Sequence, residues 1–290
     1  MAYLDPKNDL TFKKVFGEHP HLLKSFLNAL LPLEDDAQIE TLEYLPAELV
    51  PEIPLLKHSI VDVRCKDFNG RQFIVEMQMF WTESFKSRVL FNASKAYIKQ
   101  LGKGKHYNIL QPVYALSLVN EIFEPESIEY YHHYKIVNIE NSEKQLKGLE
   151  FVFVELPKFP ANNITEKKLK GLWLRFLTEI THGIEKVDEI LLQNPEIKEA
   201  LDCLQESAFS NAELETYDRY WDRISSEITL FDEYEQKGIK EGLKKGLEKG
   251  LEKGKIEGKI EVAKALKQKN ISIEIIIEAT GLTKEDIEKI

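Results

Sequence analysis

Two carboxylates and an amide stand in a stretch that is otherwise rich in apolar residues. The stretch from Ser59 to Phe80 reads SIVDVRCKDFNGRQFIVEMQMF and carries Asp62, Glu76 and Gln78. Carboxylate oxygens are ligands that divalent cations such as Mg²⁺ accept in proteins. Asp62 and Glu76 are therefore candidate metal ligands.

The same stretch predicts a β-hairpin that turns at an Asn-Gly pair ending in Gly70. The length of its loop decides which side chains face each other. A two-residue loop would pair Asp62 with Met77. A three-residue loop, with Gly70 in the left-handed conformation, would place Asp62 opposite Glu76. We favour the longer loop because glycine stands at the position that requires it.

Two carboxylates facing each other across a hairpin lie about 5 Å apart at Cβ and repel each other. Arg64 or Lys66 would compensate by forming ion pairs on a solvated face, whereas a divalent cation would compensate by binding both acids. The residues alone leave both explanations open. The favoured register also places Val61 and Val63 together on the core face of the hairpin.

A basic helix is predicted after the hairpin, from Ser84 to Leu101. Between Ser84 and Asn120 the chain has six Lys or Arg residues and no acid. Four polar residues step along this helix by four, three and four positions and form one stripe: Arg88, Asn92, Lys95 and Lys99. Next to an acid pair, such a stripe favours contact with backbone phosphates over a merely solvated face. We interpret Tyr97 as a core residue.

The order of the predicted elements indicates an α/β domain built on a small mixed sheet flanked by helices. The apolar spacing predicts two helices between Asp9 and Leu31, separated near Gly17 and Pro20, and strands over Gln111–Asn120 and Leu149–Leu156. Prolines at 46, 51 and 54 predict a loop or short strand region before the hairpin. We interpret Asp9 and Lys13 as structural, with the option that an acid from the first helix joins the metal site.

Residues 1–160 form the expected α/β domain, and residues 161–236 an all-helical region. Residues 237–268 carry a glycine at every fourth position, which is also found in flexible linkers. Each glycine costs a helix about 1 kcal/mol relative to alanine. Ile239, Leu243, Leu247 and Leu251 keep the same period, however, and favour a helix that is stable when packed on a partner, most simply in a dimer.

Residues 269–290 predict two short helices that form a packing or dimerisation cap. Gly281 closes the first helix, and Thr283 begins the second with Asp286 in the place of a capping-box acid.

The composition sets weaker limits. The net charge of −10 argues against a nucleic-acid partner, but the charge is unevenly distributed along the chain. Cys65 and Cys203 form no disulfide framework, as expected in a reducing cytosol. The first residues lack the apolar run of a signal peptide, and no later stretch is long enough to cross a bilayer. We expect a cytoplasmic protein without a membrane partner.

The chain resembles the PD-(D/E)xK nucleases and, more narrowly, the Rpn family of recombination-promoting nucleases, also labelled transposases. The matching pieces are DPKNDLTFKKVFG, VDVRCKD with VEMQ, the basic helix leading into QLGKGKHYNILQPVYAL, the helical middle region and the tail with its periodic glycines. Together they cover nearly the whole chain. The resemblance implies a restriction-endonuclease-like core and a DNA endonuclease that promotes recombination or transposition-like events.

By position, the resemblance implies that Asp62, Glu76 and Gln78 are the catalytic residues and that Asp62 and Glu76 hold Mg²⁺, with Mn²⁺ or Ca²⁺ as alternatives. The backbone carbonyl of Met77 is a further candidate ligand. Gln78 stands where the family has a lysine, and Val61 where it has a proline. An amide can orient a water molecule but brings no positive charge. The alternative is therefore a catalytically weak nuclease fold that binds DNA or serves as an oligomeric interaction protein.

Overall fold

The computed structural model describes residues 2–48, 60–102, 104, 106–160 and 168–290. The prolines at 51 and 54 lie outside these residues. The chain divides into two compact units, Met1–Trp221 and Asp222–Ile290. This boundary differs from the expected ones at 160 and 236, because the helices that follow residue 168 share the main core of the first unit.

Within the described residues of the first unit, six strands form one mixed sheet in the order β1-β2-β3-β4-β6-β5. The strands are β1 Leu42–Tyr44, β2 Val63–Asp67, β3 Gln72–Gln78, β4 Val113–Val119, β5 Tyr131–Asn138 and β6 Asn141–Glu155. Strand β4 pairs in parallel with both β3 and β6, and the other neighbours are antiparallel. The predicted strands are present. Strand β5 was not predicted, because its sequence YHHYKIVN lies at the sheet edge and is mostly exposed.

The N-terminal segment folds into two helices, as predicted. Helix α1 spans Asp9–Glu18, and helix α2 spans Pro20–Leu30. The side chain of Asn8 accepts a hydrogen bond from the Leu10 N–H and caps α1. Pro20 occupies the first position of α2, where its missing N–H is not needed.

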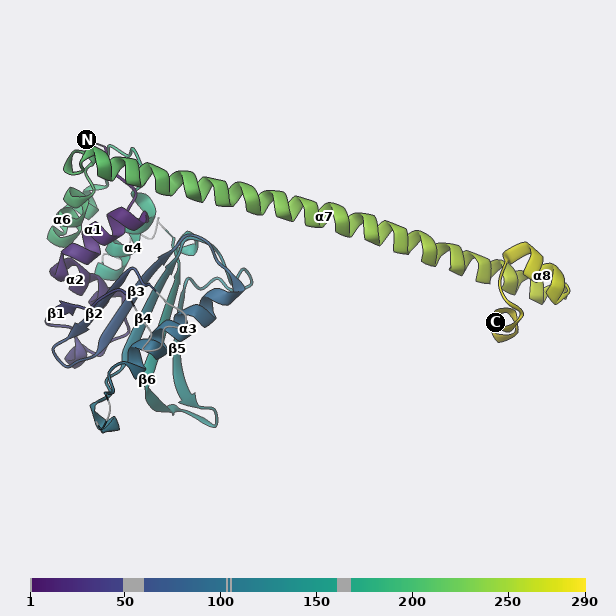
Figure 1. Ribbon diagram of the computed structural model, residues 1–290, viewed down its shortest axis with the longest axis horizontal. Helices are drawn as coiled ribbons and strands as arrows, with labels where there is room; N and C mark the ends of the chain where they lie inside the picture. Colours follow the sequence, from purple (N-terminus) through teal and green to yellow (C-terminus); the bar gives the residue numbers. More distant parts are fainter. Residues whose placement is uncertain (1, 49–59, 103, 105, 161–167) are drawn as a thin grey trace. The chain divides into compact units, whose positions relative to one another are not determined.

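Helices cover both faces of the sheet (Figure 1). One face packs against α1, α2 and the later helices α4 Leu169–Glu179, α5 Glu189–Gln193 and α6 Pro195–Cys203. Its centre is a group of aromatic rings that includes Phe16, Phe26 and Trp173. The N-terminal segment is tied to the end of this helical group, because the Leu4 N–H donates to the Leu204 carbonyl.

Helix α3, Glu83–Ile98, packs against the other face and contributes Phe85, Val89, Ala93 and Ala96 to a second core cluster. Val61 belongs to this cluster, whereas Val63 belongs to the first. The prediction that the two valines share a core face was therefore wrong. The strand geometry begins only at Val63, and the bend at Asp62 turns Val61 toward α3.

The hairpin between β2 and β3 has the predicted three-residue loop. Asp67 closes it, since its N–H donates to the Arg71 carbonyl and its carbonyl accepts from the Gly70 N–H. Gly70 has a φ of +82°, a left-handed backbone conformation that glycine adopts without strain. The Asp67 carboxylate also accepts from Nε of Arg71 at 2.6 Å, which fixes the base of the loop.

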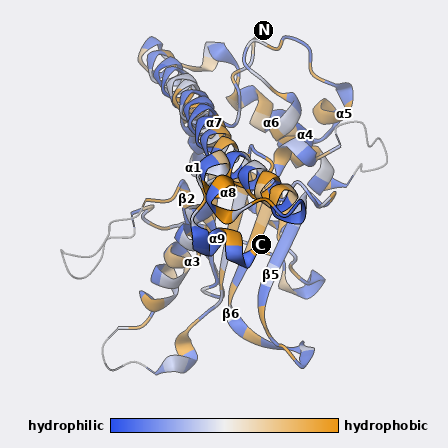
Figure 2. Ribbon diagram, turned by 90° about the vertical axis from the view of Figure 1, so that its right-hand side faces the viewer, coloured by the Kyte–Doolittle hydropathy of each residue, from blue (hydrophilic) through white to orange (hydrophobic). Residues whose placement is uncertain are grey.

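Helix α7, Asn211–Gln268, is continuous for 58 residues and includes the periodic glycines. The helix prediction for this segment is therefore confirmed over the linker alternative. In the second unit, α8 Ile273–Thr280 and α9 Lys284–Lys289 pack against the end of α7 through Ala263, Ile276 and Ile287. Figure 2 marks α8 as largely hydrophobic. Gly281 ends α8 with a φ of +65°, and Thr283 and Asp286 form the predicted capping box.

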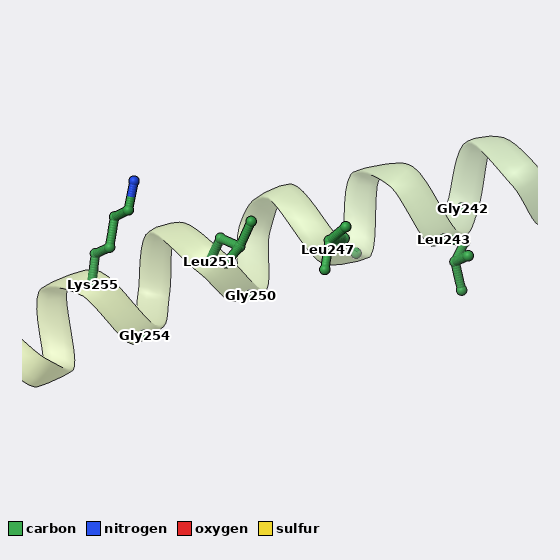
Figure 3. A pocket seen from close by; sticks show the side chains of 8 residues that line it. Gly242, Leu243, Leu247, Gly250, Leu251, Gly254 and Lys255 are labelled. Atoms are coloured by element: carbon green, nitrogen blue, oxygen red, sulfur yellow. The ribbon is translucent and has the colours of Figure 1, made fainter.

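The glycines and leucines of α7 line a shallow, open apolar groove along one face of the helix. Its lining residues are Gly242, Leu243, Gly246, Leu247, Gly250, Leu251, Gly254 and Lys255 (Figure 3). The side chains of Leu243, Leu247 and Leu251 are more than half exposed. Among the described residues, no helix is both long and apolar enough to cross a membrane.

Candidate active site

The two candidate carboxylates lie where the β2–β3 pairing ends. The register pairs Val63 with Val75, so one further step places Asp62 opposite Glu76, as predicted. The Met77 N–H donates to Oδ2 of Asp62 at 2.6 Å. A side-chain oxygen thus accepts this backbone N–H, and the partly buried carboxylate of Asp62 is fixed at the edge of the hairpin.

Helix α3 holds the Glu76 carboxylate. Glu76 is only 7% exposed, and its Oε1 accepts from Nδ2 of Asn92 at 3.0 Å. Nη2 of Arg88 lies 3.8 Å from its Oε2. Arg88 and Asn92 are four residues apart and reach Glu76 from consecutive turns. Burial raises the pKa of Glu76, against the opposing effects of the Asn92 hydrogen bond and the Arg88 charge.

Gln78 contacts the same guanidinium. Its Oε1 accepts from Nη2 of Arg88 at 2.6 Å, and its Nε2 donates to the Phe80 carbonyl at 2.7 Å. Both ends of the amide are therefore engaged by the protein itself. The positive charge that Gln78 lacks is brought to this position by Arg88.

The four residues of the predicted basic stripe have different surroundings. Arg88 and Lys99 are exposed, and Lys95 is partly buried with its Nζ 4.8 Å from the centroid of the Phe91 ring. Asn92 is only 2% exposed and donates to Glu76, so its predicted place on a DNA-facing surface was wrong. Asn92 lies three positions after Val89 and belongs to the edge of the buried helix face.

Helix α1 adds charges near Asp62. Burial raises the pKa of Asp62 to about 7, the Met77 N–H opposes this shift, and the charges of Asp9 and Glu76 add to it. Lys13 lowers the pKa and forms an ion pair with Asp9 at 2.8 Å. The sequence motif that contains Asp9 and Lys13 was interpreted as structural, and its electrostatic effect on Asp62 becomes visible only in the fold.

Neither basic residue of β2 neutralises the acid pair. Nη2 of Arg64 donates to Oε1 of Gln72, and Lys66 pairs with Glu43 at 3.0 Å. The alternative in which these two cations compensate the carboxylates was therefore wrong. Asp62 and Glu76 are left with raised pKa values, a state that a bound cation would relieve.

The donor set suits a divalent metal ion. Among the described residues, no three His, Cys, Asp or Glu side chains are placed to bind one ion, so the two carboxylates need other oxygen ligands. Oδ1 of Asn92, whose amide contacts Glu76, is buried and has no hydrogen-bond partner. Two carboxylates and an unpaired amide oxygen are hard donors of the kind that Mg²⁺, Mn²⁺ and Ca²⁺ accept. The residues present therefore fit such an ion.

A mixed sheet with Asp62 directly before β2 and Glu76 opposite it on β3, flanked by helices, is consistent with the α/β fold of the PD-(D/E)XK nucleases. The sequence profile described as PD-(D/E)XK nuclease family transposase matches residues 6–228. The chain belongs to this family, which confirms the predicted relationship and fold class. No curated protein and no solved structure matched the chain. The family supports a nuclease- or transposase-like function with DNA as the substrate.

The raised pKa of Asp62 predicts a pH-dependent stability in the metal-free protein. Its value is 3.8 in the absence of the protein environment and about 7 in the folded state, so the folded state binds this proton more tightly. Stability is then lost as the pH rises toward about 7. Asp62→Asn keeps an oxygen for the Met77 N–H but carries no charge. Its gain in melting temperature over the wild type, measured in EDTA, should grow between about pH 5 and about pH 8.

Asp36→Asn is the matched control, because Asp36 is an exposed carboxylate outside the site. Its melting temperature should differ from the wild type by the same small amount at both pH values. A gain for Asp62→Asn that is independent of pH would contradict the prediction.

Proposed function

We propose that the protein is a divalent-metal-dependent DNA endonuclease that hydrolyses phosphodiester bonds, and that it promotes recombination or transposition-like events as the Rpn resemblance implies. The main support is the pairing of Asp62 with Glu76, each held by one hydrogen bond, beside the guanidinium of Arg88. Two carboxylates with raised pKa values beside an arginine would suit a divalent ion and the phosphate of a substrate.

Asp62 and Glu76 would hold the ion, together with the backbone carbonyl of Met77. Mg²⁺ is the expected ion, with Mn²⁺ and Ca²⁺ as alternatives. When bound, the ion would neutralise charge on the scissile phosphate and lower the pKa of a water molecule. The Met77 N–H and the Asn92 amide keep the two carboxylates in place for this role.

Arg88 would supply the positive charge that the family lysine supplies at position 78. The Gln78 amide holds the guanidinium through Oε1 and is itself held by the Phe80 carbonyl. In this proposal Gln78 acts by orienting Arg88. A guanidinium has several N–H donors and stays protonated, so it suits a phosphate oxygen.

A second candidate is a catalytically weak member that binds DNA or works as an oligomeric interaction protein. The neutral Gln78 and the exposed apolar groove on α7 favour it. We place the protein in the cytoplasm in either case, which the free Cys65 and Cys203 support.

The metal proposal predicts the behaviour of two variants. Excess Mg²⁺ should raise the melting temperature of the wild type, because the ion binds the folded state. Asp62→Ala and Glu76→Ala should each abolish this rise and the cleavage of supercoiled plasmid. The measurements are thermal melts with and without metal, and plasmid conversion on agarose gels.

Asp36→Ala serves as the control and should keep both the metal-induced rise and the cleavage. Wild-type cleavage by both alanine variants would refute the assignment of the site. If the alanine variants lose cleavage but Mg²⁺ leaves the melting temperature of the wild type unchanged, the metal role alone is refuted.

We also propose that Arg88, Lys95 and Lys99 bind the DNA backbone, while Asn92 supports Glu76. Changing Lys95 and Lys99 together to alanine should weaken binding equally for unrelated sequences. The slope of log Kd against log salt should become shallower by about two phosphate contacts. Fluorescence anisotropy at several salt concentrations measures both.

The control is the double variant Lys186→Ala and Lys198→Ala, which removes two exposed lysines from the helical part of the first unit. Equal losses of affinity in the two double variants would mean that only net charge matters. An unchanged salt slope after loss of Lys95 and Lys99 would exclude them as phosphate contacts.

We propose, finally, that a second copy of the chain covers the groove on α7. The six periodic glycines cost an isolated helix about 6 kcal/mol relative to alanine, and an ideal Cβ on each of them would meet no neighbour. Small residues beside exposed leucines allow two helices to approach closely, and burial of the leucines would offset the glycine cost. A dimer is the simplest such assembly.

Replacing Leu247 and Leu251 by glutamate in the full chain should convert the dimer to a monomer. Light scattering would report the halved mass, and circular dichroism the loss of α7 helicity. Lys245→Glu with Lys249→Glu introduces the same two acids outside the residues that line the groove and should leave the mass unchanged. A monomeric wild type would contradict the proposal.

A further inference from the structure

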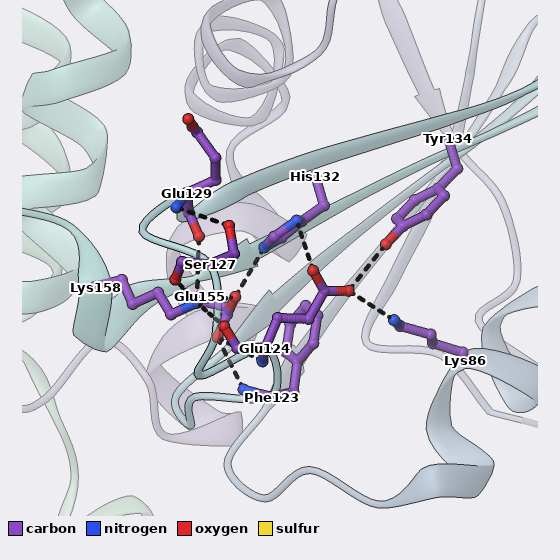
Figure 4. A network of polar contacts seen from close by, with 9 residues as sticks. All are labelled: Lys86, Phe123, Glu124, Ser127, Glu129, His132, Tyr134, Glu155 and Lys158. Atoms are coloured by element: carbon purple, nitrogen blue, oxygen red, sulfur yellow. Dashed lines mark hydrogen bonds and ion pairs between the residues drawn. The ribbon is translucent and has the colours of Figure 1, made fainter.

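A completely buried carboxylate anchors the loop between β4 and β5 (Figure 4). Glu155, at the end of β6, accepts hydrogen bonds from the backbone N–H groups of Phe123 and Glu124 at 2.8 and 3.3 Å. Its other contacts are His132 Nε2 and Lys158 Nζ, both at 2.8 Å. Glu155 therefore fixes the first part of the loop to the sheet.

Lys158 fixes the rest of the loop. Its ammonium group donates to the carbonyls of Glu124, Ser127 and Glu129 at 2.6, 2.8 and 3.3 Å. With the Glu155 carboxylate, four oxygen acceptors therefore surround the charged ammonium group of Lys158. A lysine this fully engaged leaves residues 123–129 little freedom to move.

The anchored loop in turn holds the start of α3. Oε1 of Glu124 accepts from Nζ of Lys86 at 3.1 Å and from the Tyr134 hydroxyl at 3.3 Å, and its Oε2 lies 3.5 Å from Nδ1 of His132. Beside this contact, the Trp81 ring stacks on Phe123 with centroids 4.1 Å apart. Glu124 thus joins the fixed sheet edge to the first turns of α3.

The held segment leads directly into the candidate active site. Phe80 accepts from the Gln78 amide, and Arg88 follows Lys86 by two residues on the same helix. The guanidinium of Arg88 reaches Gln78 and Glu76 only while the start of α3 keeps its present direction. A shift of about 1 Å in a group that contacts the reacting phosphate is enough to slow a reaction severely.

We propose that Glu124 is a positioning residue that holds Arg88 against Gln78 and Glu76 through its contact with Lys86. The inference rests on the proposed nuclease function. Glu124 and Lys86 are partly exposed, and such pairs contribute little to overall stability. Loss of the pair therefore loosens the start of α3 without unfolding the protein.

The kinetic test compares Glu124→Ala with Glu126→Ala, which removes an exposed carboxylate from the same loop. Glu124→Ala should lower kcat for plasmid cleavage up to about fivefold and change KM less than about twofold, because Glu124 is not among the residues proposed to bind DNA. Glu126→Ala should match the wild type. Lys86→Met should reproduce the loss in kcat, and Lys86→Arg, which keeps the charge, should restore most of it.

Hydrogen exchange on the full chain tests the same proposal without any need for cleavage. Amides of residues 80–88 should exchange up to about fivefold faster in Glu124→Ala than in the wild type, with the amides of α1 and α2 unchanged. Equal exchange in the Glu124 and Glu126 variants would overturn the proposal, as would an unchanged kcat in Glu124→Ala. If the wild type does not cleave DNA, the nuclease proposal fails, and the exchange result alone decides whether Glu124 holds α3.

Discussion

The register of the β2–β3 hairpin is the constraint on which the site depends. Gly70, with its left-handed backbone, ends a loop of three residues and thereby sets which side chains oppose each other. A loop shorter by one residue would put Met77 opposite Asp62 and turn Glu76 away from it. One glycine conformation thus decides whether the two carboxylates form a pair.

The pair is tolerated because hydrogen bonds come to it from two directions. Asp62 accepts the Met77 N–H within the hairpin, and Glu76 accepts the Asn92 amide from α3. Helix α3 is held against the sheet by Phe85, Val89, Ala93 and Ala96, so the packing of small and apolar residues sets the position of Arg88 and Asn92. The second core cluster is therefore as important to the site as the carboxylates themselves.

Much of the fold could be predicted from local signals in the sequence. Pro20 marks the break between α1 and α2, Gly70 specifies the hairpin loop, and Thr283 with Asp286 specifies the last helix, because each acts on its own backbone. Strand β5 has no comparable signal, since pairing with β6 defines it.

The site itself was predicted in part. The register argument places Asp62 opposite Glu76, but helical spacing alone does not separate a buried polar residue from its exposed neighbours. Asn92 shares the stripe of Lys95 and Lys99, yet the packing of α3 on the sheet buries it. The contact of Arg88 with Gln78 likewise depends on where α3 lies across the sheet, which no local pattern in the sequence encodes.

The packing of α1 and α2 against α4 and α6 has a consequence for the order of events during synthesis. The hairpin that carries Asp62 and Glu76 is made early, but the face of the sheet behind it is covered in part by helices that end near Leu204. The hydrogen bond from Leu4 to Leu204 closes this core only after both ends have left the ribosome. Contacts so distant in sequence form late and slowly. A nascent chain therefore carries both acids for much of its translation before the core behind the hairpin closes.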